Sequence, residues 1–362
     1  MSVKHVNGYV RWIAACVAIG RLLAQSPPAP SKAQTTVTVV SDVYYAYNPD
    51  RPASGVNLIR NFDDTANRFA LSNATVSLEH LGGVIGFRLD AGTGELERTI
   101  HQADPWAAPN RYLPQAYVGF QPAGNPALRI DAGKFFTSVG AESAYSQDNF
   151  NYSRSLLYVL GEPYYHFGVR ASVPLSKRLT VGLQLLHGWN NVMDSSGGKT
   201  LGLTSAWTRG RLTWSQTYLA GPERVATSRR FRQLYNSVVT VSTARWLSAY
   251  AEWLNGVQRL AGGGDESWYG AAGALRFSPH QRWSFSPRFG WFDDQAGFCS
   301  GTPQRLKEAT LTAEYRPAKL LISRLEYRRD WSDRQFFHPG HALSRRQQSV
   351  LVALIAVWKK ER

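Results

Sequence analysis

The sequence predicts an all-β fold, a transmembrane antiparallel β-barrel of about sixteen strands, with about fourteen or eighteen as alternatives. Three observations predict this class. Apolar and polar residues alternate in segments of about ten residues, the length that a tilted strand needs to cross a bilayer. Short and long connections follow one another along the chain, and aromatic residues gather near the segment ends. A soluble β protein would not sort its connections into two length classes so regularly.

The clearest alternation lies in residues 163–191. From Tyr165 to Val173 every second residue is apolar, and the same pattern resumes from Leu179 to Leu185. Turn-forming residues, among them Pro and Ser, separate the two runs. This stretch therefore predicts an antiparallel hairpin with one apolar and one polar face.

The remaining strands repeat this unit, each predicted from the apolar residues of its alternating face or from a bounding turn. In the N-terminal half they are 35–47 (Val37, Val39, Val43), 67–81 (ending at Gly82-Gly83), 84–91 (Ile85, Phe87, Leu89), 115–121 (Ala116, Val118, Phe120) and 128–133 (Leu128, Ile130, Ala132). After the hairpin they are 200–207, 211–218 (Leu212, Trp214, Tyr218), 231–243, 246–254, 268–277, 283–291 (Trp283, Phe285, Phe289), 308–315 (Ala309, Leu311, Ala313), 320–329 and 349–358.

Long connections alternate with the short turns between these strands. They are predicted at 48–66, 92–112, 140–162, 190–199, 221–230, 261–266, 296–304 and 330–346. Near the strand ends lie aromatic residues whose amphipathic rings suit a membrane interface: Tyr45, Tyr47, Trp189, Trp207, Tyr218, Trp283, Trp291, Tyr315 and Trp358.

The composition suits a protein of strands and turns. Aromatic residues make up 12% of the chain, and there are 31 Gly but only two Cys. No run of about eighteen apolar residues occurs, which excludes membrane-spanning helices. The mean hydropathy of −0.31 still permits a membrane barrel, because only alternate strand residues face lipid.

Residues 1–24 are predicted to be a signal peptide, with Lys4 and Arg11 before the apolar stretch 12–20. A frayed apolar N-terminus is the alternative, and a lipoprotein box at 13–16 is less favoured. Removal of this segment lowers the formal charge from +15 to +12 and leaves Cys299 as the single cysteine. The remaining organisation is a Pro-rich leader at 25–34, a barrel at 35–358 and a charged tail at 359–362.

The middle of the chain resembles a known family. Residues 133–142 (GKFFTSVGAE), 151–158 (NYSRSLLY) and 162–170 (EPYYHFGVR) are similar to the OmpL-like putative β-barrel porin family of Gram-negative outer membranes. The resemblance implies a diffusion channel without specifying its solute. Barrels of this kind commonly end on an aromatic residue that the barrel-insertion machinery reads, whereas here four charged residues follow Trp358.

Charged residues at polar strand positions are expected to face the lumen, because an unpaired charge at the bilayer midplane costs roughly 2–4 kcal/mol. The basic ones are Arg88, Arg129, Arg170, Arg178, Arg211, Arg282 and Arg288, and the acidic ones are Asp42, Asp90, Asp131, Glu252, Glu308 and Glu314. The surplus of Arg predicts a weak preference for anions. The alternative is that these charges pair and only keep the lumen hydrated.

The connection 140–162 is expected to fold into the lumen as a constriction, because loops of this length are usually functional or disordered. The alternative is a surface loop. Its candidate pore residues stand among Tyr145, Tyr152 and Tyr158, and they are Glu142, Asp148, Arg154 and Glu162.

Signatures of cofactor, metal and nucleic-acid sites are weak. Residues 198–200 (GKT) resemble the end of a phosphate loop, but Met193 occupies the place of its first Gly. His166 and His187 lack metal-ligand spacing, and the acidic pairs 63–64 and 293–294 suit solvated loops better than a divalent cation. The basic pairs 229–230 and 345–346 suit contact with lipopolysaccharide better than nucleic acid.

Together these features predict an outer-membrane porin, a passive channel for small hydrophilic solutes that needs no cofactor and is not an enzyme. An outer-membrane barrel hydrolase, whose Ser and His would meet only in space, is one alternative, and a structural or adhesin barrel without an open channel is another. The expected partners are membrane lipid and lipopolysaccharide, the solutes, the insertion machinery and further copies of the chain in a homo-oligomer.

Overall fold

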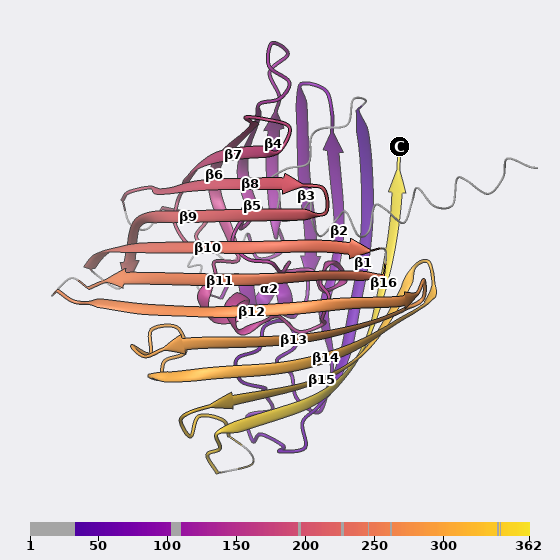
Figure 1. Ribbon diagram of the computed structural model, residues 1–362, viewed down its shortest axis with the longest axis vertical. Coiled ribbons are helices and arrows are strands. Elements are labelled where there is room, and N and C mark those ends of the chain that lie inside the picture. The colour runs from indigo at the N-terminus through magenta and orange to yellow at the C-terminus, as the bar shows by residue number, and fades with distance from the viewer. Residues whose placement is uncertain are drawn as a thin grey trace, which may run out of the picture.

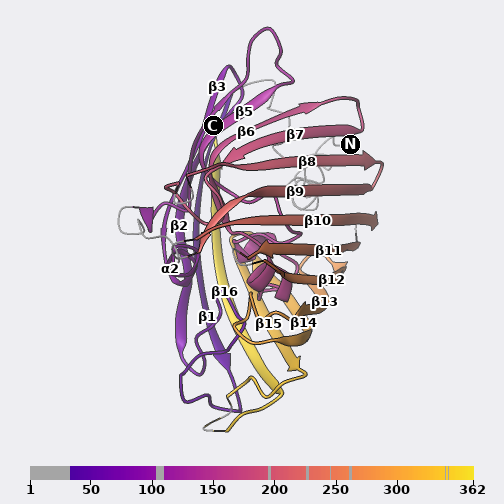
Figure 2. The same ribbon diagram turned by 90° about the vertical axis from the view of Figure 1, so that its left-hand side faces the viewer.

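The protein, described here from a computed structural model, is a closed antiparallel barrel of sixteen strands (Figures 1 and 2). The structure describes residues 33–102, 110–194, 197–225, 228–244, 246–260, 263–338, 340 and 342–362. The barrel closes where β1 pairs with β16, with Val43 opposite Leu354. The predicted fold class and strand number are confirmed. The predicted signal peptide and nearly all of the Pro-rich leader lie outside the described residues.

The strands range from six residues in β4 to 17 in β10. They are β1 (Gln34–Tyr47), β2 (Phe69–Leu81), β3 (Ile85–Thr93), β4 (Gln115–Phe120), β5 (Arg129–Phe136), β6 (Tyr165–Pro174), β7 (Leu179–Leu186), β8 (Thr200–Arg209), β9 (Leu212–Val225), β10 (Ser228–Ala244), β11 (Leu247–Arg259), β12 (Asp265–His280), β13 (Trp283–Asp294), β14 (Gln304–Ala318), β15 (Leu321–Ser332) and β16 (Arg346–Glu361). The predicted hairpin is formed by β6 and β7, with Ala171 opposite Leu183.

Short turns join the strands at one end of the barrel, the end at which β1 begins and β16 finishes. The tight turn between β2 and β3 depends on two glycines, since Gly82 and Gly83 have φ values of 94° and 74°. Most connections at the other end are long, and one carries a helix, α2 (Glu95–Ile100). The connection 137–164, between β5 and β6, contains a 3₁₀ turn, η1 (Ser146–Asp148), and a π-helical turn, η2 (Leu157–Gly161).

Two predicted boundaries were wrong. Residues 221–230 were expected to form a basic loop, but most of them extend β9 and β10, which stay paired as far as Val225 and Ser228. The charged tail also continues as strand, because Glu361 lies opposite Thr36 of β1. In both places the ladder continues past the apolar alternation, because strand pairing uses backbone groups and does not depend on that alternation.

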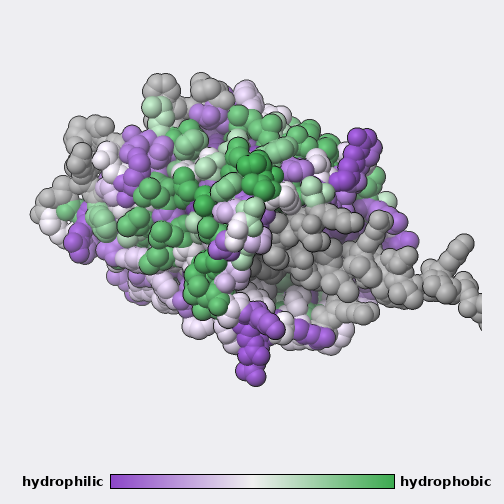
Figure 3. Space-filling model, turned by 90° about the horizontal axis from the view of Figure 1, so that it is seen from above, coloured by the Kyte–Doolittle hydropathy of each residue, from purple (hydrophilic) through white to green (hydrophobic). Residues whose placement is uncertain are grey.

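Outward side chains of the strands are largely apolar, and Figure 3 shows hydrophobic patches, interrupted by hydrophilic residues, on one side of the molecule. In β16 Val350, Val352 and Leu354 are exposed, while the residues between them are buried. Aromatic residues form a belt near each end. Trp283 stacks on Tyr315 near the short turns, and Tyr269 contacts Trp291 near the long loops. Trp189 was expected in such a belt but packs instead against the buried Trp268. Among the described residues no helix is long and apolar enough to cross a membrane.

Candidate functional site in the barrel lumen

The connection 137–164, called the lumen segment below, crosses the inside of the barrel. Figure 2 shows its coiled part between the wall of β1 and β16 and the wall of β10–β13. Tyr152 donates to Asp42 of β1 (2.8 Å), and on the opposite wall the amide of Gly140 donates to Asn236 of β10 (3.0 Å). The segment therefore reaches across the bore, and the predicted constriction residues lie inside the barrel.

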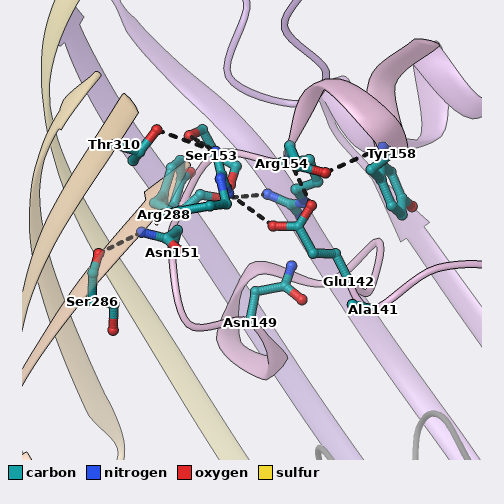
Figure 4. Close-up of polar contacts among 12 residues, drawn as sticks. Ala141, Glu142, Asn149, Asn151, Ser153, Arg154, Tyr158, Ser286, Arg288 and Thr310 are labelled. Atoms are coloured by element: carbon teal, nitrogen blue, oxygen red, sulfur yellow. Dashed lines mark hydrogen bonds and ion pairs between the residues drawn. The ribbon is translucent and has the colours of Figure 1, made fainter. Parts of the chain in front are cut away.

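Arg288 of β13 joins the lumen segment to the wall (Figure 4). Its Nη1 lies 2.8 Å from Oε1 of Glu142, and its Nε lies 2.8 Å from Oε1 of Glu308 on β14. It also donates to the carbonyl oxygen of Ser153. The side chains of Arg288 and Glu308 are fully buried, and that of Glu142 is nearly so. A buried guanidinium with two carboxylates and a carbonyl is well compensated, so this contact holds the segment in one position.

Strand β15 supplies a second set of contacts. Arg324 donates to the carbonyl oxygens of Ser146 (2.8 Å), Asn149 (2.8 Å) and Asn151 (3.0 Å). In the other direction, Glu326 accepts from the backbone amides of Tyr152 (2.6 Å) and Ser153 (3.1 Å). An irregular backbone inside a barrel must have its polar groups satisfied, and these wall side chains satisfy them.

Arg154 fixes the fold of the segment itself. Its side chain is buried and donates to backbone oxygens of the segment, at 3.2 Å from Ser143 and 2.7 Å from Tyr152. Its own carbonyl oxygen accepts from Arg328 of β15. Arg154, predicted as a pore residue, therefore braces the segment rather than facing solvent.

An apolar ring packs against the other side of the segment. Leu156 and Leu157 belong to one buried cluster with Leu254, Trp268 and Phe292, which point inward from β11, β12 and β13. Further members of this cluster face inward from neighbouring strands near the long loops: Leu186, Leu219, Leu234 and Leu306. This ring was not predicted from the sequence, because inward positions were expected to be polar. Adjacent apolar pairs at strand ends, such as Leu185-Leu186 and Trp291-Phe292, were the available signal.

Glu162 ends the segment in an acidic environment. Its carboxylate is buried, and both burial and the nearby Glu252 carboxylate raise its pKa well above the usual range. Gly140 packs against it with a φ of 90°, and a Cβ at that position would collide with Oε2 of Glu162. Glu252 accepts from Asn236 (2.7 Å) and from the amide of Ala141 (3.1 Å). Asp148, in η1 near the middle of the segment and partly exposed, has a pKa raised by burial to about 6.

On the opposite side of the bore, β3, β5 and β6 carry a second group of predicted pore residues. Nε of Arg88 lies 3.0 Å from Asp90, and Asp131 lies between Arg129 (2.9 Å) and Arg170 (3.0 Å). Inward Arg side chains also surround Glu314, to which Nε of Arg316 donates at 2.7 Å and Arg324 at 2.9 Å. The predicted residues are thus divided between the two walls of the lumen.

Three basic residues were wrongly placed in the lumen. Arg178, Arg211 and Arg282 lie in short turns and are exposed, because their strands begin one residue later. Arg211 donates to the carbonyl oxygen of Thr243, near the end of β10. These residues belong to the rim of the barrel.

Other buried charged residues of the barrel interior were missed. On β15 the charged residues Arg324, Glu326, Arg328 and Asp330 stand at every second position, a pattern visible in the sequence. Arg60, by contrast, lies in the connection between β1 and β2, where no pattern marks it. It is buried and pairs with Asp63 (3.1 Å) and with Asp330 of β15 (3.2 Å).

The acidic pairs considered for metal binding have protein partners. Asp63 is paired with Arg60, and Asp293 lies 2.7 Å from Arg305. Asp294 accepts from the amides of Cys299 (3.0 Å) and Ser300 (2.7 Å). No group of three potential metal ligands occurs within the described residues.

Comparison with known proteins places this architecture among porins. The profile of the family described as putative beta-barrel porin-2, OmpL-like, matches residues 34–357. The search of curated proteins found no match. The structure is similar to the anion-selective porin from Comamonas acidovorans, at 11% identity and a TM-score of 0.63 over 90% of this chain and 100% of that chain. It is also similar to the outer membrane channel DcaP of Acinetobacter baumannii, at 10% identity and a TM-score of 0.61 over 90% of this chain and 97% of that one. At these identities the two likenesses show the fold alone.

Proposed function

The chain belongs to the family of OmpL-like putative β-barrel porins and is an outer-membrane porin, and we propose that its lumen segment is the constriction of a passive, weakly anion-preferring channel. Small hydrophilic solutes would diffuse through the hydrated part of the lumen with no covalent step. The observation that carries this proposal is the position of the segment, which contacts β1 on one wall and β10 and β13 on the other.

The exposure of the lumen charges supports anion preference. Four inward Arg side chains keep partial contact with solvent: Arg88 (24%), Arg170 (17%), Arg276 (16%) and Arg316 (27%). Their partners are hidden, with Asp90 at 0%, Asp131 at 1% and Glu314 at 3%. Glu79, at 28%, is the exposed acid beside Arg88. A permeating ion therefore meets guanidinium groups before carboxylates, and such an arrangement attracts anions.

A reversal potential tests this proposal. With the protein in a planar bilayer and a tenfold KCl gradient, we expect the sign that corresponds to chloride preference. The double variant Arg276→Gln/Arg316→Gln should move the potential toward cation preference, because Glu314 then keeps only Arg324. The control Arg211→Gln/Arg282→Gln removes the same charge from exposed turns and should shift it less. Cation preference of the unmodified protein would contradict the proposal.

The absence of catalysis is part of the same proposal. A buried lumen histidine, His166, has Nε2 3.1 Å from Oγ1 of Thr137 and Nδ1 2.9 Å from the carbonyl oxygen of Gly188. Both ring nitrogens are thus engaged with the wall and the segment, which suits a structural role better than proton transfer. Turnover of a chromogenic ester that His166→Ala abolishes would favour the hydrolase alternative.

We also propose that the protein assembles as a homo-oligomer. The outer membrane protein OmpT of Vibrio cholerae is described in a trimer form. Its structure is similar to this one at 9% identity and a TM-score of 0.58, over 90% of this chain and 99% of that one. Size determination of the detergent-solubilised protein with correction for bound detergent tests this, and a single-copy mass would contradict it.

A further inference from the structure

Three basic residues face outward from the barrel near the long loops. Lys307 of β14, Arg329 of β15 and Arg346 of β16 occupy the same alternating face as the lipid-exposed Leu311, Tyr327 and Val350 of those strands. They are called the outer basic patch below. A cation at such a position is costly at the bilayer centre and is tolerated near the interface.

The register brings the patch together. Lys307 lies opposite Trp331, and Trp331 lies opposite Arg346. In the next row toward the short turns, Arg329 lies opposite Ala309 on one side and Gln348 on the other. Because neighbouring strands are about 4.8 Å apart, Lys307 and Arg346 arise about 10 Å from each other. Long flexible side chains at that separation can converge on one anionic group.

The patch is not neutralised by the protein. Within the described residues, no ion pair joins Lys307, Arg329 or Arg346 to a carboxylate, and the buried Nε of Arg329 has no hydrogen-bond partner. The guanidinium of Arg329 lies over the ring of Trp331, at 5.3 Å from its centroid. Two acids at this rim already have partners: Asp293 pairs with the side chain of Arg305, and Asp333 accepts from the backbone amide of Arg305.

Apolar rows continue directly from the patch toward the short turns. Leu311 lies opposite Tyr327, and Tyr327 lies opposite Val350. The following row is Ala313, Leu325 and Val352. Next to this sector, the corresponding outward residues of β1 and β2 near the long loops are aromatic or apolar, such as Tyr45, Tyr47 and Phe69. The cations therefore occupy one sector of the wall, directly above a surface for acyl chains.

We propose that the outer basic patch binds a phosphorylated glycolipid of the outer leaflet, with the phosphate on Lys307, Arg329 and Arg346 and the acyl chains along β14–β16. The long loops of such barrels face the cell exterior, so the patch lies at the level of the outer-leaflet head groups. An anionic head joined to apolar tails matches the basic row and the rows beside it. A soluble anion would contact the basic row and leave the apolar rows uncovered.

The test uses the full barrel in detergent, and native mass spectrometry measures its bound lipid. The patch variant is Lys307→Gln/Arg329→Gln/Arg346→Gln. The matched control is Arg209→Gln/Arg282→Gln/Lys360→Gln, which removes three exposed charges from the short-turn end. A heat-modifiable band on electrophoresis verifies that each barrel is folded. The probes are bisphosphorylated lipid A, the same lipid without phosphates, phosphatidylglycerol and inorganic pyrophosphate.

We expect bisphosphorylated lipid A to bind the unmodified protein and the control about a hundredfold more tightly than it binds the patch variant. This factor follows because each of the three cations contributes about one kcal/mol to the binding free energy. The dephosphorylated lipid, phosphatidylglycerol and pyrophosphate should bind the unmodified protein more weakly. Equal binding to the patch variant, or equal binding of the dephosphorylated lipid, would overturn the phosphate site. Equal binding of phosphatidylglycerol or pyrophosphate would overturn the choice of a glycolipid. Single-channel conductance should stay unchanged in the patch variant, so this result is separable from the channel proposal.

Discussion

At the scale of single residues, the lumen segment is held by charges that are buried and paired. Arg288 and Arg324 donate to backbone oxygens that would otherwise be left without partners inside the barrel. Removal of one member of a buried pair typically costs about 3–5 kcal/mol, because the other charge remains. Glu162 differs, because burial raises its pKa and the carboxylates of Glu252 and Glu142 raise it further.

The position of Glu162 predicts a pH dependence. Its pKa in the folded protein lies well above the unfolded value of about 4.3, so the folded state holds more protons between the two values. Stability of the segment should therefore fall as the pH rises through that window, and the single-channel current should become larger or noisier over the same rise in pH. Single-channel recording across the pH range measures this. Glu162→Gln should flatten the response.

Asp148 serves as the comparison for this prediction. Its pKa is raised to about 6, so its own contribution has the same sign but is complete at lower pH, between about 4 and about 6. Asp148→Asn should therefore leave the change above about pH 6 in place. If Glu162→Gln and the unmodified protein respond identically as the pH rises, the role given to Glu162 is wrong.

At the scale of elements, the lumen segment combines two kinds of contact. Its polar side binds β13 and β15, and its apolar side packs Leu156 and Leu157 on the inward ring from β11–β13. The ring and the segment depend on each other, because apolar residues facing a hydrated lumen would be unfavourable without a cover. The segment is thus part of the packed interior as well as of the proposed channel.

Removal of residues 143–156 should increase single-channel conductance. This deletion takes away η1 and the backbone groups bound by Arg324 and Glu326, while it leaves β5 and β6 intact. Planar-bilayer recording measures the effect, and resistance to unfolding in detergent verifies that the wall is closed. An unchanged conductance in a folded barrel would exclude the segment as the constriction.

At the scale of the whole molecule, the closed ladder gives each strand position one of two environments. Leu89 of β3 is 43% exposed on the outer face, while its neighbour Arg88 points inward to Asp90. A change of one residue in register would exchange the two. The barrel is therefore specified by the alternation of inward and outward side chains along each strand as much as by their composition.

An exchange of Arg88 and Leu89 tests this assignment of inward and outward positions. The variant Arg88→Leu/Leu89→Arg keeps the composition but places a guanidinium on the lipid face, at a cost of up to roughly 2–4 kcal/mol according to depth. We expect a lower urea midpoint for unfolding from lipid vesicles. The single change Arg88→Leu, which also leaves Asp90 without this Arg, is the reference. An exchange variant as stable as that reference would contradict the assignment of the two faces.

Alternation and connection length were enough to predict the barrel, the strand number and the hairpin of β6 and β7. The same reasoning placed residues 140–162 as a candidate constriction but not the role of Arg154, whose partners are backbone oxygens of the segment itself. Strand ends were predicted less well. Strand pairing extends β9 and β10 into the expected loop at 221–230. The alternation of apolar and polar residues does not indicate where this pairing stops.

The sequence by itself determined which residues alternate, and thereby the lipid-facing wall, because burial in a membrane acts on each strand position locally. Only the tertiary structure decided what the lumen contains. Arg60 meets Asp330, and Leu157 meets Phe292, across long separations in sequence, and nothing local selects such pairs. They form because closure of the ladder between β1 and β16 brings distant strands around one bore, whose buried charges and apolar side chains must then satisfy one another.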